Sequence, residues 1–309
     1  MPAAHSGRVQ ETTTTPSGAA PIRVVVDGTP RGTLLVLGSI VSVQFGAAIA
    51  SGLFGDVGPA GVVLMRQGFA AIVLMAVARP RLSGRSAADW RVVVAFGAVL
   101  AVMNLSFYEA VARLPLGLAV TIELLGPLGL AAALARRRQE LAWCVVACAG
   151  VVLLGEGGSS VSAAGVAFAI VAAGGWASYI LLVGAAGRRF DGVDGVALSM
   201  VVASLLSSPF GLRAGSGFLD TRVLLLGAAV ALLSAIVPFS LEVTARRHVA
   251  PGLFGVLMSL SPAVAALSGL LVLGQHLGAA QIAGMAMVVV ASAASVRGRR
   301  QGSSTAASP

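Results

Sequence analysis

Lysine is absent from this sequence, and all 21 basic residues are arginines. A phosphate-binding loop of the Walker type needs a lysine that reaches the phosphates. An enzyme that works through a Schiff base needs a lysine amine. Both mechanisms are therefore excluded.

Charged residues are also scarce. They make up 11% of the 309 residues, whereas apolar residues make up 57%. Soluble domains have roughly a quarter charged residues and about half apolar ones. The net charge of +9 could suggest nucleic-acid binding, but the arginines fall in short clusters between apolar segments and not on one face. The composition predicts an integral membrane protein that binds no nucleic acid.

Cysteine and histidine are too few and too scattered for a metal site. Cys144 and Cys148 lie four residues apart in one apolar segment, without a histidine or carboxylate beside them. We interpret both as small residues on a helix-packing face. The three histidines lie in a tail and in loops, so an intramembrane serine hydrolase would lack its base. No metal, disulfide, cofactor or catalytic residue is predicted.

Long apolar runs dominate what the sequence does contain. Residues 1–31 and 297–309 are polar tails, and the first is predicted to be disordered. Between them we predict ten membrane-spanning helices, most of which reach the roughly 17–25 residues that cross a bilayer. Their ranges are 32–54, 60–78, 92–112, 116–135, 141–155, 163–187, 195–212, 223–243, 252–274 and 279–296.

The arginines predict the orientation of these spans. When the connections are assigned alternately to the two sides, 17 of the 21 arginines fall on the side that holds both termini. Arg113, Arg213 and Arg222 fall on the other side, and Arg66 lies inside a span. By the positive-inside rule, both termini are cytoplasmic, in the inner or plasma membrane.

The two halves of the chain also repeat each other. Glu109-Ala-Val-Ala-Arg113, followed by Gly117 and Pro127, returns as Glu242-Val-Thr-Ala-Arg246, followed by Gly252 and Pro262. We therefore predict an all-α membrane protein with two five-helix repeats, 32–155 and 163–296. Because five is odd, the second repeat is inverted relative to the first. Such repeats enclose a substrate site near the middle of the membrane.

Several motifs in these spans resemble one known family. They are Met103-Asn104 with Phe107-Tyr108, Pro115-Leu-Gly117, Glu123 with Gly126-Pro127, Gly175-Trp176-Ala-Ser-Tyr179, Pro238-Phe-Ser-Leu-Glu242, and Phe254-Gly255-Val-Leu-Met258-Ser259 with Pro262. The pattern resembles the EamA-type branch of the drug/metabolite transporter superfamily and, within it, the inner-membrane threonine/homoserine exporters. The resemblance implies a secondary transporter.

Ionisable residues inside spans are the first candidates for substrate binding, because a charge at the membrane centre is costly. Glu109 and Glu242 each precede an arginine by four residues, a spacing typical of an ion pair at a helix end. The resemblance keeps Glu242 a candidate for the site.

Glu123 has no arginine within a helical turn, and Pro127 one turn later should kink its helix. Its carboxylate could bind a substrate ammonium, or it could form a structural pair with Arg66, which is predicted at a similar depth. The two interpretations are compatible.

Polar groups on other spans are further candidates. They are Gln44, Asn104, Tyr108, Trp176, Tyr179 and Ser259, with Pro262 as the second-half counterpart of the kink at Pro127. Each could line the substrate cavity, or could simply form contacts between helices.

Taken together, these features predict an exporter of small amino acids, similar to threonine or homoserine, that works by alternating access. A drug or other metabolite exporter of the same superfamily is the alternative. An intramembrane enzyme and a channel fit less well. The partners are a small substrate and the bilayer, and the oligomeric state stays open.

Overall fold

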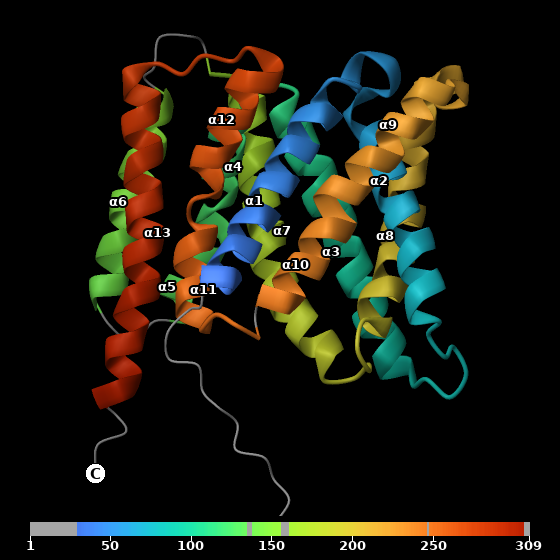
Figure 1. The fold of residues 1–309 in the computed structure, drawn as a ribbon, viewed down its shortest axis with the longest axis horizontal. Coiled ribbons are helices and arrows are strands. Elements are labelled where there is room, and N and C mark those ends of the chain that lie inside the picture. Colours follow the sequence, from blue (N-terminus) through green and yellow to red (C-terminus); the bar gives the residue numbers. More distant parts are fainter. Residues whose placement is uncertain (1–29, 135–137, 156–160, 246, 306–309) are drawn as a thin grey trace, which may run out of the picture.

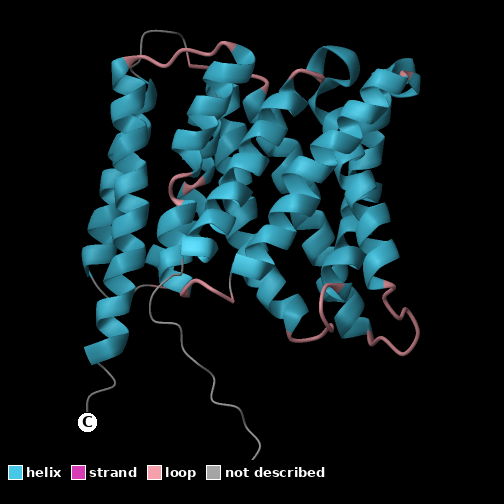
Figure 2. Ribbon diagram, in the orientation of Figure 1, coloured by secondary structure: helices cyan, strands magenta, loops and turns pink. Residues whose placement is uncertain are grey.

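The computed structural model describes residues 30–134, 138–155, 161–245 and 247–305. Within these ranges the regular structure is entirely helical (Figure 2). The predicted disordered tail 1–31 lies outside the described residues up to residue 29, and Pro30 and Arg31 already belong to the first helix.

The first half of the chain forms six helices, because the predicted fourth span is divided into two. They are α1 (Pro30–Ser51), α2 (Phe54–Ala78), α3 (Ala87–Val111), α4 (Leu116–Glu123), α5 (Leu125–Ala133) and α6 (Arg138–Gly155).

In the second half, the predicted eighth and ninth spans are also interrupted. The elements are α7 (Ala163–Gly187), α8 (Asp194–Gly211), the 3₁₀ helix η1 (Leu212–Leu219), α9 (Thr221–Ala231), the π turn η2 (Leu232–Ile236), α10 (Val237–Ala245), α11 (Pro251–Met258), α12 (Ser261–Leu273) and α13 (Ala279–Thr305). The predicted polar tail from residue 297 is therefore helical as far as Thr305. No proline follows Val296 before the end of this helix, so nothing forces it to stop where the apolar run ends.

Eight helical stretches in the described chain are long and apolar enough to cross a membrane. Each coincides with one of the predicted spans. The apolar parts of α6 and α13, Ala142–Leu153 and Ala279–Ser295, are shorter than a full span. α6 begins with the charged residue Arg138, and α13 continues past Arg297, so the apolar part of each helix is shorter than the helix itself.

The helices stand side by side in one bundle (Figure 1). α1 packs along α10, and α7 packs along α3. α2 packs against α8, and α6 pairs with α13 at one edge of the bundle. α4 approaches α12 so closely that a Cβ atom on Gly117 would lie 2.9 Å from the Cα atom of Ala266.

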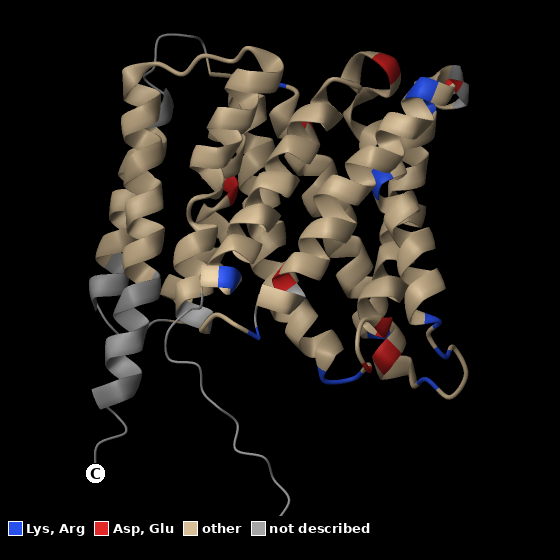
Figure 3. Ribbon diagram, in the orientation of Figure 1, with Lys and Arg blue, Asp and Glu red and all other residues tan. Residues whose placement is uncertain are grey.

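Most of the arginines in the described chain lie at one end of the bundle, the lower end in Figure 3. This Arg-rich end contains the α2–α3, α7–α8 and α10–α11 connections. Two ion pairs join the first two of these regions. Arg85 lies 3.4 Å from Asp194, and Arg189 lies 3.0 Å from Asp89. Asp89 also completes the capping box of α3 with Ser86.

Candidate functional site

Arg66 is carried by a helix that is broken near the end of the bundle opposite the Arg-rich end. Gly58 adopts a φ angle of 67°, a left-handed conformation that suits glycine, and regular helix resumes at Pro59. Arg66 lies seven residues further on, which places it about 10 Å into the bundle. Its side chain is half-buried.

The guanidinium of Arg66 is held by two other helices. Its Nη1 donates to Oδ1 of Asn104 on α3. Its Nε donates to the hydroxyl of Ser234 at 2.7 Å, and its Nη2 donates to the Ser234 carbonyl at 3.0 Å. A guanidinium has five N–H donors. Two of them therefore have no hydrogen-bond partner in the described part of the chain.

Ser234 is a site residue that the sequence analysis missed. It lies in the π turn η2, and π turns inside helices are frequent at functional sites. Pro238, four residues later, has no N–H to donate to the Ser234 carbonyl, so that carbonyl is free to accept from Arg66. In the sequence, a serine four residues before a proline inside an apolar span would have indicated this free carbonyl.

Asn104 and Tyr108 lie one helical turn apart on α3, and both are buried. The Asn104 Nδ2 atom donates to the Leu100 carbonyl at 2.7 Å, which fixes the Oδ1 atom toward Arg66. Tyr108 forms edge-to-face pairs with Phe54 and Phe107, and its hydroxyl lies near the Ser234 side chain. We call Arg66, Asn104, Tyr108 and Ser234 the Arg66 cluster.

Glu123 is the last residue of α4, where the fourth span breaks. Pro127 in α5 cannot donate to the Glu123 carbonyl, as the sequence predicted. The side chain is half-buried, and no hydrogen bond or ion pair to its carboxylate is found among the described residues. Glu123 lies seven residues beyond Leu116, so its depth matches that of Arg66.

The predicted direct pairing of Glu123 with Arg66 is wrong for this structure. The three ion pairs in the described chain are Arg85–Asp194, Arg113–Glu109 and Arg189–Asp89. Asn104 and Ser234 hold the guanidinium instead, and Glu123 interacts with the Arg66 charge only at longer range. Two opposite charges thus lie at one depth without neutralising each other in a contact.

Gln44 of α1 lies at the same depth, seven residues before Ser51. It is 5% exposed, and its Oε1 atom has no hydrogen-bond partner within the described ranges. Ala48, one turn later on the same face, shares a hydrophobic cluster with Ile122 of α4.

The other candidates have contacts in different parts of the bundle. Trp176 packs on a cluster formed by α5, α6 and α13, and Tyr179 pairs with the ring of Phe96 at 5.5 Å. Ser259 is buried at the α11–α12 break and donates to the Val256 carbonyl. Pro262 begins α12 there, which parallels the break before Pro127.

The two predicted helix-end ion pairs have different outcomes. Glu109 pairs with Arg113, which confirms the structural interpretation of that glutamate. The predicted partner of Glu242, Arg246, lies outside the described residues. Glu242 itself accepts a hydrogen bond of 2.9 Å from the Ser39 hydroxyl of α1.

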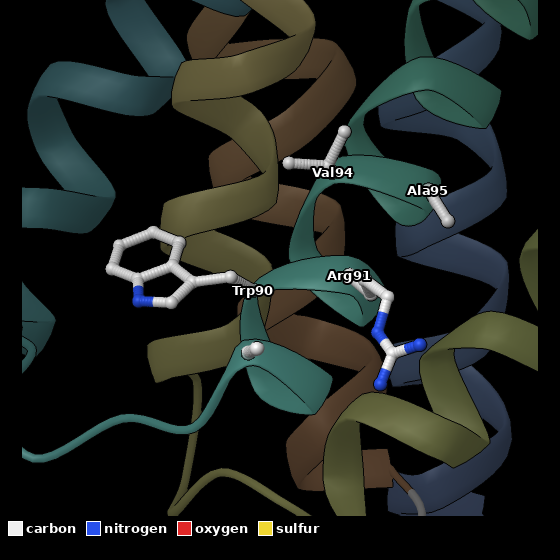
Figure 4. A pocket seen from close by; sticks show the side chains of 5 residues that line it. Trp90, Arg91, Val94 and Ala95 are labelled. Carbon is white, nitrogen blue, oxygen red and sulfur yellow. The ribbon is translucent and has the colours of Figure 1, made fainter.

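Two further features do not belong to the site. A hollow of about 530 Å³ on the outside of α3 is lined by Trp90, Arg91 and Val94 with Ala87 and Ala95 (Figure 4). Tryptophan and arginine near a helix end suit the membrane–water interface. On α6, Cys144 contacts the Leu128 carbonyl, but Cys148 is exposed, so only Cys144 fits the predicted packing face.

Known relatives share most of the length of this sequence. The threonine/homoserine exporters RhtA of Escherichia coli (strain K12) and Salmonella typhimurium (strain LT2) are each 37% identical to it over 265 residues. The match covers 84% of this chain and 89% of each relative. The model of the EamA-like transporter family matches residues 163–297. The chain belongs to this family.

A solved crystal structure also resembles this EamA-like protein. It is 20% identical in sequence, with a TM-score of 0.57, and the superposition covers 87% of this chain and 98% of that one. This likeness shows the fold alone. The relatives are transporters, so the family membership implies a multi-pass membrane protein that moves a small molecule and performs no covalent chemistry.

Proposed function

We propose that this protein exports small amino acids of the threonine and homoserine class. The observation that carries the proposal is the 37% identity to threonine/homoserine exporters over most of the chain. The site is consistent with this substrate, because Arg66 and Glu123 offer opposite charges at one depth of the bundle. An amino acid at neutral pH is a zwitterion that needs both.

Each charge has a role in this proposal. Two N–H donors of Arg66 have no partner among the described residues, and a guanidinium binds a carboxylate through two parallel hydrogen bonds. Glu123 has a half-buried carboxylate with no hydrogen-bond partner in the described part of the chain, which suits a substrate ammonium. Asn104 and Ser234 hold Arg66 in position, and Tyr108 lies beside Ser234. Glu242, Trp176, Tyr179 and Ser259 would act elsewhere along the path.

The mechanism that we propose is alternating access between two inverted five-helix repeats, 32–155 and 163–296. The packing of the helices supports it, because α1 lies on α10 of the second repeat as α7 lies on α3 of the first. The interruptions support it as well. The fourth helical stretch of each half is divided, between α4 and α5 and between α11 and α12.

In the proposed orientation the protein lies in the inner membrane of the cell. Both termini, and with them the Arg-rich end, face the cytoplasm. The Arg66–Glu123 site then lies nearer the external side. A substrate moving outward would meet it after passing Glu242.

Expression in a host strain tests the proposed function. We expect the protein to confer growth at toxic concentrations of homoserine or threonine, and to lower the intracellular pools of both while they rise outside. The matched control is the Glu123→Gln variant at equal membrane abundance. Unchanged pools on induction would contradict the proposal and favour the alternative, a drug or other metabolite exporter of the same family.

A further inference from the structure

One buried amide in the bundle lacks the partner that its surroundings should supply. Gln44 is 5% exposed, and its Oε1 atom accepts no hydrogen bond from the residues that the structure describes. Buried polar groups in folded proteins nearly always have a partner, so an orphaned one calls for a reason. A bound substrate that supplies the missing hydrogen bond is such a reason.

A second buried glutamine shows how this chain satisfies an amide that serves only structure. Gln67 of α2 is 1% exposed. Its Nε2 atom donates to the Leu100 carbonyl at 3.2 Å, and its Oε1 atom accepts from the Ser207 hydroxyl at 2.7 Å. Gln67 follows Arg66 directly, yet both ends of its amide are paired. The unpaired Oε1 atom of Gln44 therefore distinguishes this amide from that of Gln67.

α1, the helix that carries Gln44, adjoins both halves of the proposed binding site, and Gln44 lies on its face toward α4. Gly46, two residues after Gln44 and therefore on the opposite face of α1, packs so closely on Ser234 that an added Cβ atom would lie 3.1 Å from the Ser234 Cβ atom. Ser234 holds Arg66. Ala48 belongs to the hydrophobic cluster of Ile122, the residue before Glu123. α1 thus lies against the support of the cation and against the helix that carries the anion.

We propose that Gln44 recognises the side-chain hydroxyl of the exported amino acid, as the third point of a site in which Arg66 binds the carboxylate and Glu123 binds the ammonium. This inference rests on the proposed function and adds the reason for its preference. Threonine and homoserine share a hydroxyl group beyond the α-carbon. A hydroxyl both donates and accepts, so it satisfies the amide in either orientation of its oxygen and nitrogen.

The chemistry predicts which substrates the site rejects. Valine has the shape of threonine with a methyl group in place of the hydroxyl, and norvaline replaces homoserine in the same way. A site that hydrogen-bonds a hydroxyl discriminates strongly against the analogue without it, because the site's own polar group is then left unpaired. An apolar pocket would hardly separate the two.

The experiment compares transport of threonine and valine in proteoliposomes containing the full-length protein. The wild type should transport threonine at least about tenfold more efficiently than valine. Gln44→Met keeps the volume of the side chain and removes the amide, so it should reduce this ratio about tenfold. Gln67→Met, the matched control, should lower the amount of folded protein but leave the ratio unchanged.

The outcomes separate the two proposals. A wild type that transports neither threonine nor homoserine would overturn the proposed function and this inference with it. A wild type that exports threonine, with the same preference over valine in Gln44→Met, would overturn the inference alone. If Gln44→Met fails to assemble, competition in the wild type decides. Valine and norvaline should compete at least about tenfold more weakly than threonine and homoserine, and equal competition would refute the role of Gln44.

Discussion

Arg66 and Glu123 carry opposite charges inside the bundle, but each has different surroundings. Arg66 is fixed by Asn104 and Ser234, whereas the Glu123 carboxylate has no hydrogen-bond partner in the described chain. The arginine is therefore built into the structure before any substrate arrives. The glutamate is free to respond to one.

This difference predicts the effect of Glu123→Gln. The substitution removes a charge that forms no hydrogen bond or ion pair with the described residues, so the protein should reach the membrane in near-normal amounts. Export of threonine should fall at least about tenfold, because hydrogen bonds to charged groups contribute about 1.5–3 kcal/mol. Efflux of labelled threonine from loaded cells measures this decrease in export.

Glu109→Gln, which breaks only the exposed pair with Arg113, should keep wild-type export. Equal export by Glu123→Gln and the wild type would make Glu123 structural.

At this scale the sequence predicted the individual residues better than their partners. Arg66, Asn104 and Tyr108 were recognised because polar groups are rare in apolar spans. Ser234 was overlooked because serine is common at helix contacts, and its role depends on the carbonyl that Pro238 leaves free. The direct pair of Arg66 with Glu123 followed from equal depth alone. Depth along parallel helices does not determine the distance between them.

Among the elements, α5 shows how little space separates two helices of the bundle. A Cβ atom on Gly126 would lie 2.0 Å from the Ala173 carbonyl oxygen of α7. The break before α5 thus lies where the fourth span meets the backbone of the second half.

We therefore expect Gly126→Ala to push α5 away from α7 and to destabilise the protein by about 1–3 kcal/mol, the usual cost of overpacking. Thermal unfolding in detergent should show a lower melting temperature. Gly129→Ala provides the control on the same helix, because an added Cβ atom there meets nothing within 4 Å. That variant should melt no lower than the wild type, and similar losses in both would argue against the close contact.

The element boundaries were largely predictable because apolar runs and prolines mark them. Within the described residues, helices lie in each of the ten predicted ranges, and Pro127 and Pro262 indicated the two divided spans. The kink at Gly58 and the π turn at Leu232–Ile236 were not predicted. Gly58 lies two residues before the predicted start of the second span, and the π turn is a local change in winding inside an apolar sequence, which hydropathy does not record.

For the whole molecule, the gathering of arginines at one end predicts the orientation in the membrane. A reporter fused after Arg300 should show cytoplasmic activity, and a reporter fused after His276, in the α12–α13 connection, should show external activity. The physical reason is that short arginine-rich connections are retained on the cytoplasmic side. An external signal after Arg300 would require an odd number of spans and would end the argument for inverted repeats.

The hydrogen bonds of Arg66 also have a consequence for the synthesis and membrane insertion of the chain. Asn104 follows Arg66 by 38 residues, but Ser234 follows it by 168. At roughly 5–20 residues per second, a ribosome needs about 8–34 seconds to reach Ser234 after making Arg66. During that interval the second span must enter the lipid with its guanidinium incompletely satisfied. Nascent chains halted in the first half should therefore be the most exposed to quality-control proteases, and synthesis of the eighth span should end that period.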